Sequence, residues 1–180
     1  MVEPTWSDRY REHVLDLIGR SGIHVRDQEL DQLLLVDFGL GDFEREGVAI
    51  TDIVHTPALR LKILVLLPGQ TLPEHIHPPY DDSPGKEETL RVISGSVRVY
   101  LPGPDTMREG AIPEGKEEFY TLRNEHLLEP IRQLTIPPDT WHWFQAGTQG
   151  AVCYAFYPQA VESHNRFRDP RVPKHIAPGY

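Results

Sequence analysis

Short runs of alternating apolar and polar residues, separated by glycine and proline, fill most of the chain after residue 47. In the clearest run, Leu59 to Leu67, every second residue is leucine, isoleucine or valine, and Arg60 and Lys62 lie between them. Further runs lie at 96–101, 117–122, 133–136 and 152–157. A period of two is typical of β-strands, because successive side chains point to opposite faces of a sheet. Many short strands with such punctuation predict an antiparallel sandwich or barrel.

Before this region the apolar residues follow a helical period. Thr5 and Asp8 resemble a capping box at the start of a first helix, and Gly22 is a plausible end. The apolar face of this helix would contain Tyr10, Val14, Leu17 and Ile18. A second, shorter helix is predicted to start at Asp27. Its buried side would contain Leu30, Leu33 and Leu34.

These patterns predict one all-β domain with N-terminal helices. Residues 1–50 would form a helical apron packed on a barrel of residues 51–157, and residues 158–180 would form a tail rich in proline and charge. A length of 180 residues suits one domain with a sizeable core.

Composition narrows the classes of function. The net charge is −9 and the basic residues are interspersed among acids, so we expect no nucleic-acid partner. No apolar stretch approaches the length of a membrane span, and residues 1–11 contain no apolar signal region. Cys153 is the single cysteine and cannot form a disulfide within the chain, which fits a reducing cytoplasm.

Three histidines and one glutamate have spacings that suit a metal site. His75 and His77 are two residues apart on a predicted strand, so both rings would point to the same face. Glu88 returns on the following strand, and His142 comes from a loop or strand much later. Three imidazoles and one carboxylate suit Mn, Fe, Co, Ni or Zn and leave coordination positions open for a substrate. The sequence therefore predicts a metalloenzyme.

The spacing around these residues resembles the cupin pattern. Gly69 is followed by five residues and then His75-Ile76-His77, and Glu88 is followed by six residues and then a turn glycine, Gly95. Glu87 does not keep this interval. The second half, Pro137 to His142, has Asp139 where the pattern has glycine. The resemblance implies a single cupin, a jelly-roll-like antiparallel β-barrel.

Longer stretches resemble the small cupin-type D-lyxose isomerases. The similarity covers roughly residues 20 to 172, and its most specific parts are Gly85-Lys86-Glu87-Glu88-Thr89 and His142-Trp143-Phe144-Gln145-Ala146-Gly147. The resemblance implies an aldose–ketose isomerase that converts D-lyxose to D-xylulose, or D-mannose to D-fructose. It further implies a homodimer that uses manganese, with proton transfer by Lys86. The metal ligands that it implies are His75, His77, Glu88 and His142.

One position departs from this family. The family carries a second catalytic carboxylate on the strand after the last metal histidine, and the matching position here is Ala155. Alanine cannot transfer a proton, so either another acid substitutes or the activity differs. The candidate acids are Glu74, Glu87 and Glu162.

Several alternatives therefore stay open. The same ligands suit Fe(II) and dioxygen, as in a cupin dioxygenase, and a cupin that kept its metal and lost its acid–base pair would only bind sugar. Without the resemblance, Lys86 would be interpreted as a solvent-facing lysine in the loop 78–87. Trp141, Trp143 and Phe144 flank His142 and could either stack on a sugar ring or fill the core.

Overall fold

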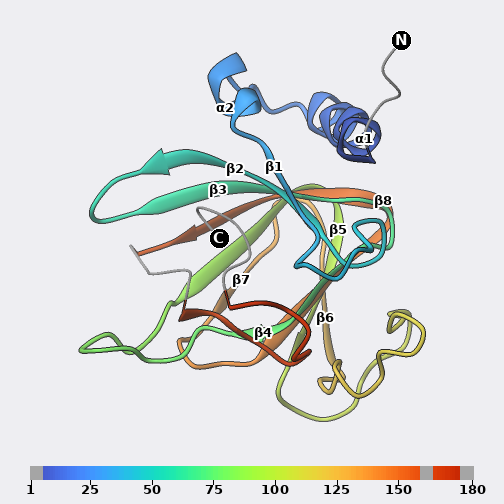
Figure 1. Cartoon of the computed structure of the whole chain (residues 1–180), viewed down its shortest axis with the longest axis vertical. Coiled ribbons are helices and arrows are strands. Elements are labelled where there is room, and N and C mark those ends of the chain that lie inside the picture. Colours follow the sequence, from blue (N-terminus) through green and yellow to red (C-terminus); the bar gives the residue numbers. More distant parts are fainter. Residues whose placement is uncertain (1–5, 159–163, 175–180) are drawn as a thin grey trace.

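The computed structural model describes residues 6–158 and 164–174, and within these ranges one antiparallel sheet of nine strands curls into a barrel (Figure 1). Two helices precede it, α1 at Trp6–Arg20 and α2 at Asp27–Asp31. The strands are β1 Leu34–Val36, β2 Val48–His55, β3 Arg60–Leu66, β4 Thr71–Ile76, β5 Glu88–Leu101, β6 Asn124–Leu128, β7 Gln133–Ile136, β8 His142–Tyr157 and β9 Arg166–Phe167.

Strand β8 joins the two halves of the sheet. Its first residues pair with β4 and its last residues pair with β3, while β5 runs along its other edge. Strands β1 and β2 extend the sheet beyond β3, β9 extends it beyond β4, and β6 and β7 pair with β5. Every pairing between two of these strands is antiparallel, which confirms the prediction of an all-β barrel with N-terminal helices.

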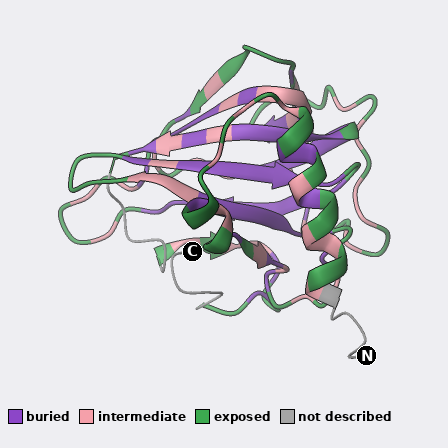
Figure 2. Cartoon of the chain, turned by 90° about the horizontal axis from the view of Figure 1, so that it is seen from above, coloured by how far each residue is buried: buried purple, intermediate pink, exposed green. Residues whose placement is uncertain are grey.

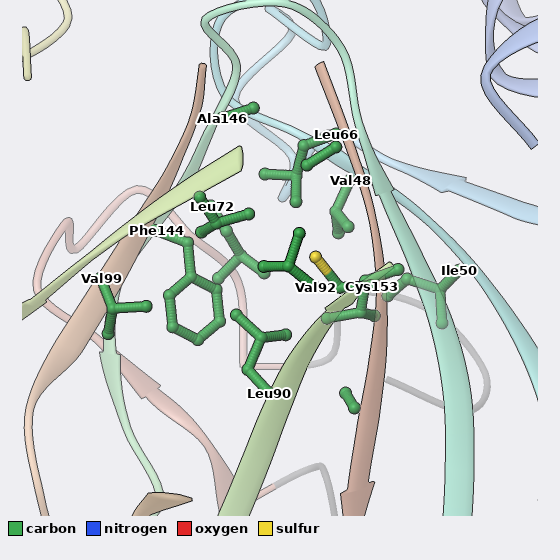
Figure 3. Close-up of a cluster of buried hydrophobic side chains, with 14 of the residues drawn as sticks. Val48, Ile50, Leu66, Leu72, Leu90, Val92, Val99, Phe144, Ala146 and Cys153 are labelled. Atoms are coloured by element: carbon green, nitrogen blue, oxygen red, sulfur yellow. The ribbon is translucent and has the colours of Figure 1, made fainter. Parts of the chain in front are cut away.

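The inner face of the barrel is apolar at one end and charged at the other. Along β3 the inward positions run from Leu66 through Leu64 to Lys62, and all three are buried. Along β5 they run from Val92 through Leu90 to Glu88. Figure 3 shows the apolar part of this interior, where leucine, valine and phenylalanine side chains from several strands meet. The change from apolar to charged marks the end of the barrel that holds the site.

Helix α1 covers the outer face of the sheet, and Figure 2 shows it lying across the strands. Its buried residues Val14, Leu17 and Ile18 belong to the same apolar cluster as Ile63 and Val65 of β3. Both faces of β3 are therefore buried. None of the described helices has the length and apolar character needed to cross a bilayer.

Three local predictions are wrong. Leu34 was expected on the buried side of the second helix, but it lies in β1 and is 39% exposed. Gly95 was expected in a turn, but it lies inside β5 beside a register shift, with φ of 75°. A Cβ atom at Gly95 would lie 1.9 Å from the carbonyl oxygen of Gly150, so the bulge requires glycine. The third wrong prediction is a strand at residues 117–122.

Residues 117–122 form no strand, and the strand in this region is β6 at Asn124–Leu128. The Glu74 carboxylate accepts hydrogen bonds from the backbone nitrogens of Thr121 and Leu122, at 2.6 and 3.2 Å. Tyr120 is 1% exposed and donates a hydrogen bond to Glu46 at 2.8 Å. Glu74 thus takes two backbone donors that a strand would offer to a neighbouring strand, and Glu46 holds the Tyr120 side chain.

Candidate metal centre

The four side chains predicted as metal ligands lie together at the charged end of the barrel. His75 is the last residue but one of β4, which ends at Ile76, and His77 follows the strand directly. Glu88 is the first residue of β5, and His142 is the first residue of β8. One nitrogen or oxygen atom from each side chain lies within 4.8 Å of the corresponding atoms of the others. All four residues are at most 5% exposed. Such proximity of four buried donor atoms suits a single cation.

The backbone and one asparagine orient the three rings. Nδ1 of His75 lies 2.9 Å from the carbonyl oxygen of Pro73, and Nδ1 of His142 lies 2.7 Å from that of Thr140. Nδ1 of His77 lies 2.7 Å from Oδ1 of Asn165. Because each Nδ1 faces an oxygen that can only accept a hydrogen bond, the ring proton is on Nδ1. Each Nε2 is therefore unprotonated, and its lone pair can bind a cation at the centre of the cluster.

A divalent ion fits this donor set. Nε2 of His142 is buried and has no hydrogen-bond partner among the described residues. Nε2 of His77 lies 3.1 Å from Oε2 of Glu88, and Nε2 of His142 lies 3.9 Å from the same oxygen. A buried nitrogen acceptor without a donor is unfavourable, and coordination to a cation satisfies it.

The electrostatics of the cluster also suit a cation. Burial, His142 and His77 lower the pKa of His75 well below its usual value, and burial and His77 lower the pKa of His142 to about 3. Burial acts to raise the pKa of Glu88, but Lys86 and His77 outweigh it and hold this pKa well below its usual value. At neutral pH both rings are therefore neutral and the carboxyl is ionised, which are the protonation states that bind metal.

Lys86 lies beside this cluster. Its side chain is 7% exposed, with Nζ 3.6 Å from Oε2 of Glu88 and 4.2 Å from the ring centroid of Tyr157. The alternative interpretation as a solvent-facing lysine is wrong. Glu87, next to it, is exposed and points away, as the alternation of an extended chain requires. Gly85 has φ of 98°, and a Cβ atom there would lie 2.3 Å from the carbonyl oxygen of His77.

A small cavity opens beside Glu88 and His75. Its lining includes the ionisable residues Lys62, His75, Lys86, Glu88 and Tyr157, and the apolar residues Leu72, Phe144 and Ala155. The side chains of two metal-cluster residues and of the two lysines therefore face one shared space.

Sequence reasoning missed Lys62, and it left open whether the aromatic residues near His142 face a ligand or fill the core. In the alternating pattern of β3, Lys62 lies on the same face as Leu64 and Leu66. This shared face is the feature of the sequence that indicates an inward-pointing Lys62. Of the aromatics near His142, Phe144 lines the cavity. Trp143 is fully buried and stacks on Tyr100, with ring centroids 3.7 Å apart, in a separate cluster.

Asn165 provides a test of how the cluster is held. Replacing Asn165 with alanine removes the acceptor for Nδ1 of His77, 2.7 Å away, and leaves the four donor side chains in place. We expect metal affinity to fall about 10- to 100-fold, as for other residues that orient metal-bound histidines. Competition titration with a chromogenic chelator measures this. Asn124→Ala, in β6, is the control and should leave affinity unchanged; equal affinities in the two variants would refute a role for Asn165.

Comparison with curated proteins shows relatives along almost the whole chain. A D-lyxose/D-mannose isomerase from Thermosediminibacter oceani is 39% identical over 173 residues, covering 96% of each chain. A D-lyxose ketol-isomerase from Cohnella laeviribosi is 39% identical over 163 residues, covering 90% of each chain. No protein-family model matches the chain.

Solved structures share the fold at much lower identity. The L-ribose isomerase of Acinetobacter sp. DL28 with L-ribose has a TM-score of 0.73 at 16% identity, covering 92% of each chain. That of Cellulomonas parahominis with L-ribose has a TM-score of 0.72 at 17% identity, with the same coverage. These neighbours support the cupin-like barrel. With relatives 39% identical over nine-tenths of its length or more, the chain belongs to the D-lyxose isomerase family.

Proposed function

We propose that this chain is a metal-dependent aldose–ketose isomerase that converts D-lyxose to D-xylulose, with D-mannose to D-fructose as a second reaction. The observation that carries the proposal is the buried cluster of three histidines and one glutamate beside a cavity with two lysines. Membership of the D-lyxose isomerase family favours isomerisation over the dioxygenase and over a binding-only cupin.

In this proposal His75, His77, Glu88 and His142 hold a divalent ion. When bound, the ion supplies a Lewis acid for the carbonyl and hydroxyl oxygens of the sugar. We propose manganese, which the resemblance implies, and the nitrogen and oxygen donors are compatible with it. Hydrogen bonds to backbone carbonyls orient the rings of His75 and His142, and neighbouring charges keep the Glu88 carboxyl ionised without the ion.

The reaction moves two protons. The proton on C2 of the aldose is delivered to C1, and the proton on the C2 hydroxyl oxygen moves to the C1 oxygen. We propose that Lys86 carries one of these transfers, because its ammonium nitrogen is buried, lines the cavity and lies 3.6 Å from Glu88. Two transfers between different atoms favour a second group.

We propose Glu162 as that second group. Glu74 is 1% exposed but is bound by Thr121, Leu122 and Arg168, and it does not line the cavity. Glu87 is exposed. Glu162 lies outside the described residues. It is the remaining candidate, in a segment whose described neighbours in sequence lie at the site: Tyr157 lines the cavity and Asn165 contacts His77.

Replacing Glu162 with glutamine tests this assignment. We expect turnover to fall about 100-fold or more, since a positioned acid–base group contributes that much, while metal content stays at the wild-type level. Glu87→Gln removes a nearby carboxylate that is exposed, and it should leave turnover unchanged. Wild-type turnover in Glu162→Gln would contradict the assignment.

The overall function is tested with a panel of pentoses and hexoses. Metal-loaded protein should form ketose from D-lyxose faster than from the other aldoses, without consuming oxygen. Oxygen uptake with iron would support the dioxygenase, and sugar affinity without turnover would support the binding protein. We further expect a homodimer located in the cytoplasm, which analytical ultracentrifugation and cell fractionation would test.

A further inference from the structure

Lys62 is a buried cation in the interior of the barrel, and it takes no part in the two proposed proton transfers. It is 3% exposed and occupies the inward position of β3 that follows Leu66 and Leu64 toward the site. A lysine is among the residues least often buried, because its ammonium loses favourable hydration. An apolar side chain would continue the core at this position, whereas lysine brings a positive charge to this end of the barrel.

The neighbours of Lys62 direct it into the cavity. On the adjacent strand it lies opposite Ala155, whose side chain ends at Cβ and leaves space in front of it. Both residues line the cavity together with Glu88 and His75. Lys62 Nζ lies 5.8 Å and Lys86 Nζ lies 4.2 Å from the ring centroid of Tyr157. The cavity therefore contains two ammonium groups on a shared aromatic wall, next to the metal cluster.

We propose that Lys62 contacts the sugar and stabilises the negative charge of the enediolate. The inference rests on the proposed isomerase function. When the C2 proton leaves to the base, the electron pair of the C–H bond delocalises onto the carbonyl oxygen, which becomes negative. Lys62 keeps its own proton throughout and donates a hydrogen bond to the sugar oxygens. A fixed cation in a buried site stabilises such charge far better than water does.

Lys62→Met tests this, because methionine is an unbranched side chain only one atom shorter than lysine and carries no charge. Turnover should fall about 100-fold, the cost of removing one donor to a developing oxyanion, with KM changing less than kcat. Lys62→Arg should recover part of this loss. Lys174→Met removes an exposed lysine and should behave as wild type. The metal content of all variants should equal that of wild type.

The binding of two ligands that do not react distinguishes an electrostatic role of Lys62 from a role in packing alone. D-threonohydroxamate, a four-carbon hydroxamate whose anion mimics the enediolate, and D-arabinitol, the neutral reduced form of D-lyxose, are titrated into each metal-loaded variant. Lys62→Met should weaken hydroxamate binding about tenfold or more, and alditol binding much less. Equal losses for both ligands, lost metal, or wild-type turnover would each overturn the role of Lys62. If wild-type protein fails to isomerise any aldose, the proposed function fails, and hydroxamate binding still decides whether Lys62 holds an anion.

Discussion

Replacing His142 with alanine is expected to remove the bound metal and to reduce isomerisation about 1000-fold or more. His142 is fully buried, and the other donors of the cluster among the described residues are only His75, His77 and Glu88. Three donors would remain, and the imidazole would leave a buried gap beside Glu88. Elemental analysis after dialysis measures the metal, and ketose formation from D-lyxose measures the activity.

His55→Ala is the matched control for this change. His55 ends β2, is exposed and lies outside the cluster, so its loss should alter neither metal content nor turnover. A His142→Ala protein that retains one tightly bound ion and full activity would contradict the proposed ligand set. The thermal unfolding midpoint of both variants shows whether the fold survives.

Lys86→Met is expected to lower kcat about 100- to 10,000-fold while the metal content stays at the wild-type level. The side chain of Lys86 is 7% exposed and its ammonium lies 3.6 Å from the Glu88 carboxylate, so it is the cation of the loop 78–87 that faces the site. Methionine preserves most of the buried aliphatic stem, but it removes the ammonium that lies over the Tyr157 ring and cannot carry a proton. Steady-state kinetics with D-lyxose and elemental analysis give the two quantities.

Glu87→Gln controls for changes in the same loop, because the neighbouring side chain is exposed. It should show wild-type kcat and metal content. A Lys86→Met protein with wild-type kcat would refute a role in proton transfer. Loss of metal from Lys86→Met would instead show that the lysine acts through the charge of Glu88.

Part of the metal cluster could be predicted from local geometry, and His142 could be predicted from the resemblance of residues 137–142 to the second half of the cupin pattern. Alternation brings His75 and His77 to one side, and the interval from Glu88 to Gly95 is fixed by a bulge that only glycine permits. Such constraints act within a few residues, so they can be found in the sequence. The barrel followed from the same alternation, and β7 at Gln133–Ile136 has the predicted bounds.

Features that depend on distant segments could not be predicted in this way. Lys62 alternates with apolar residues, and only the helix packed outside β3 shows that both faces of the strand are buried. The aromatic run at Phe119 and Tyr120 has strand character, yet Glu74 and Glu46 bind this segment from other parts of the chain. Trp143 stacks on Tyr100 of β5, which the sequence around His142 does not reveal.

The most direct test of the metal-dependent mechanism is isomerisation of D-lyxose by protein stripped with a chelator, before and after manganese is restored. We predict no ketose from the stripped protein, and full turnover when each chain has bound one ion. With D₂O as solvent, the D-xylulose formed should carry deuterium on C1. Undiminished turnover by the stripped protein would contradict the account.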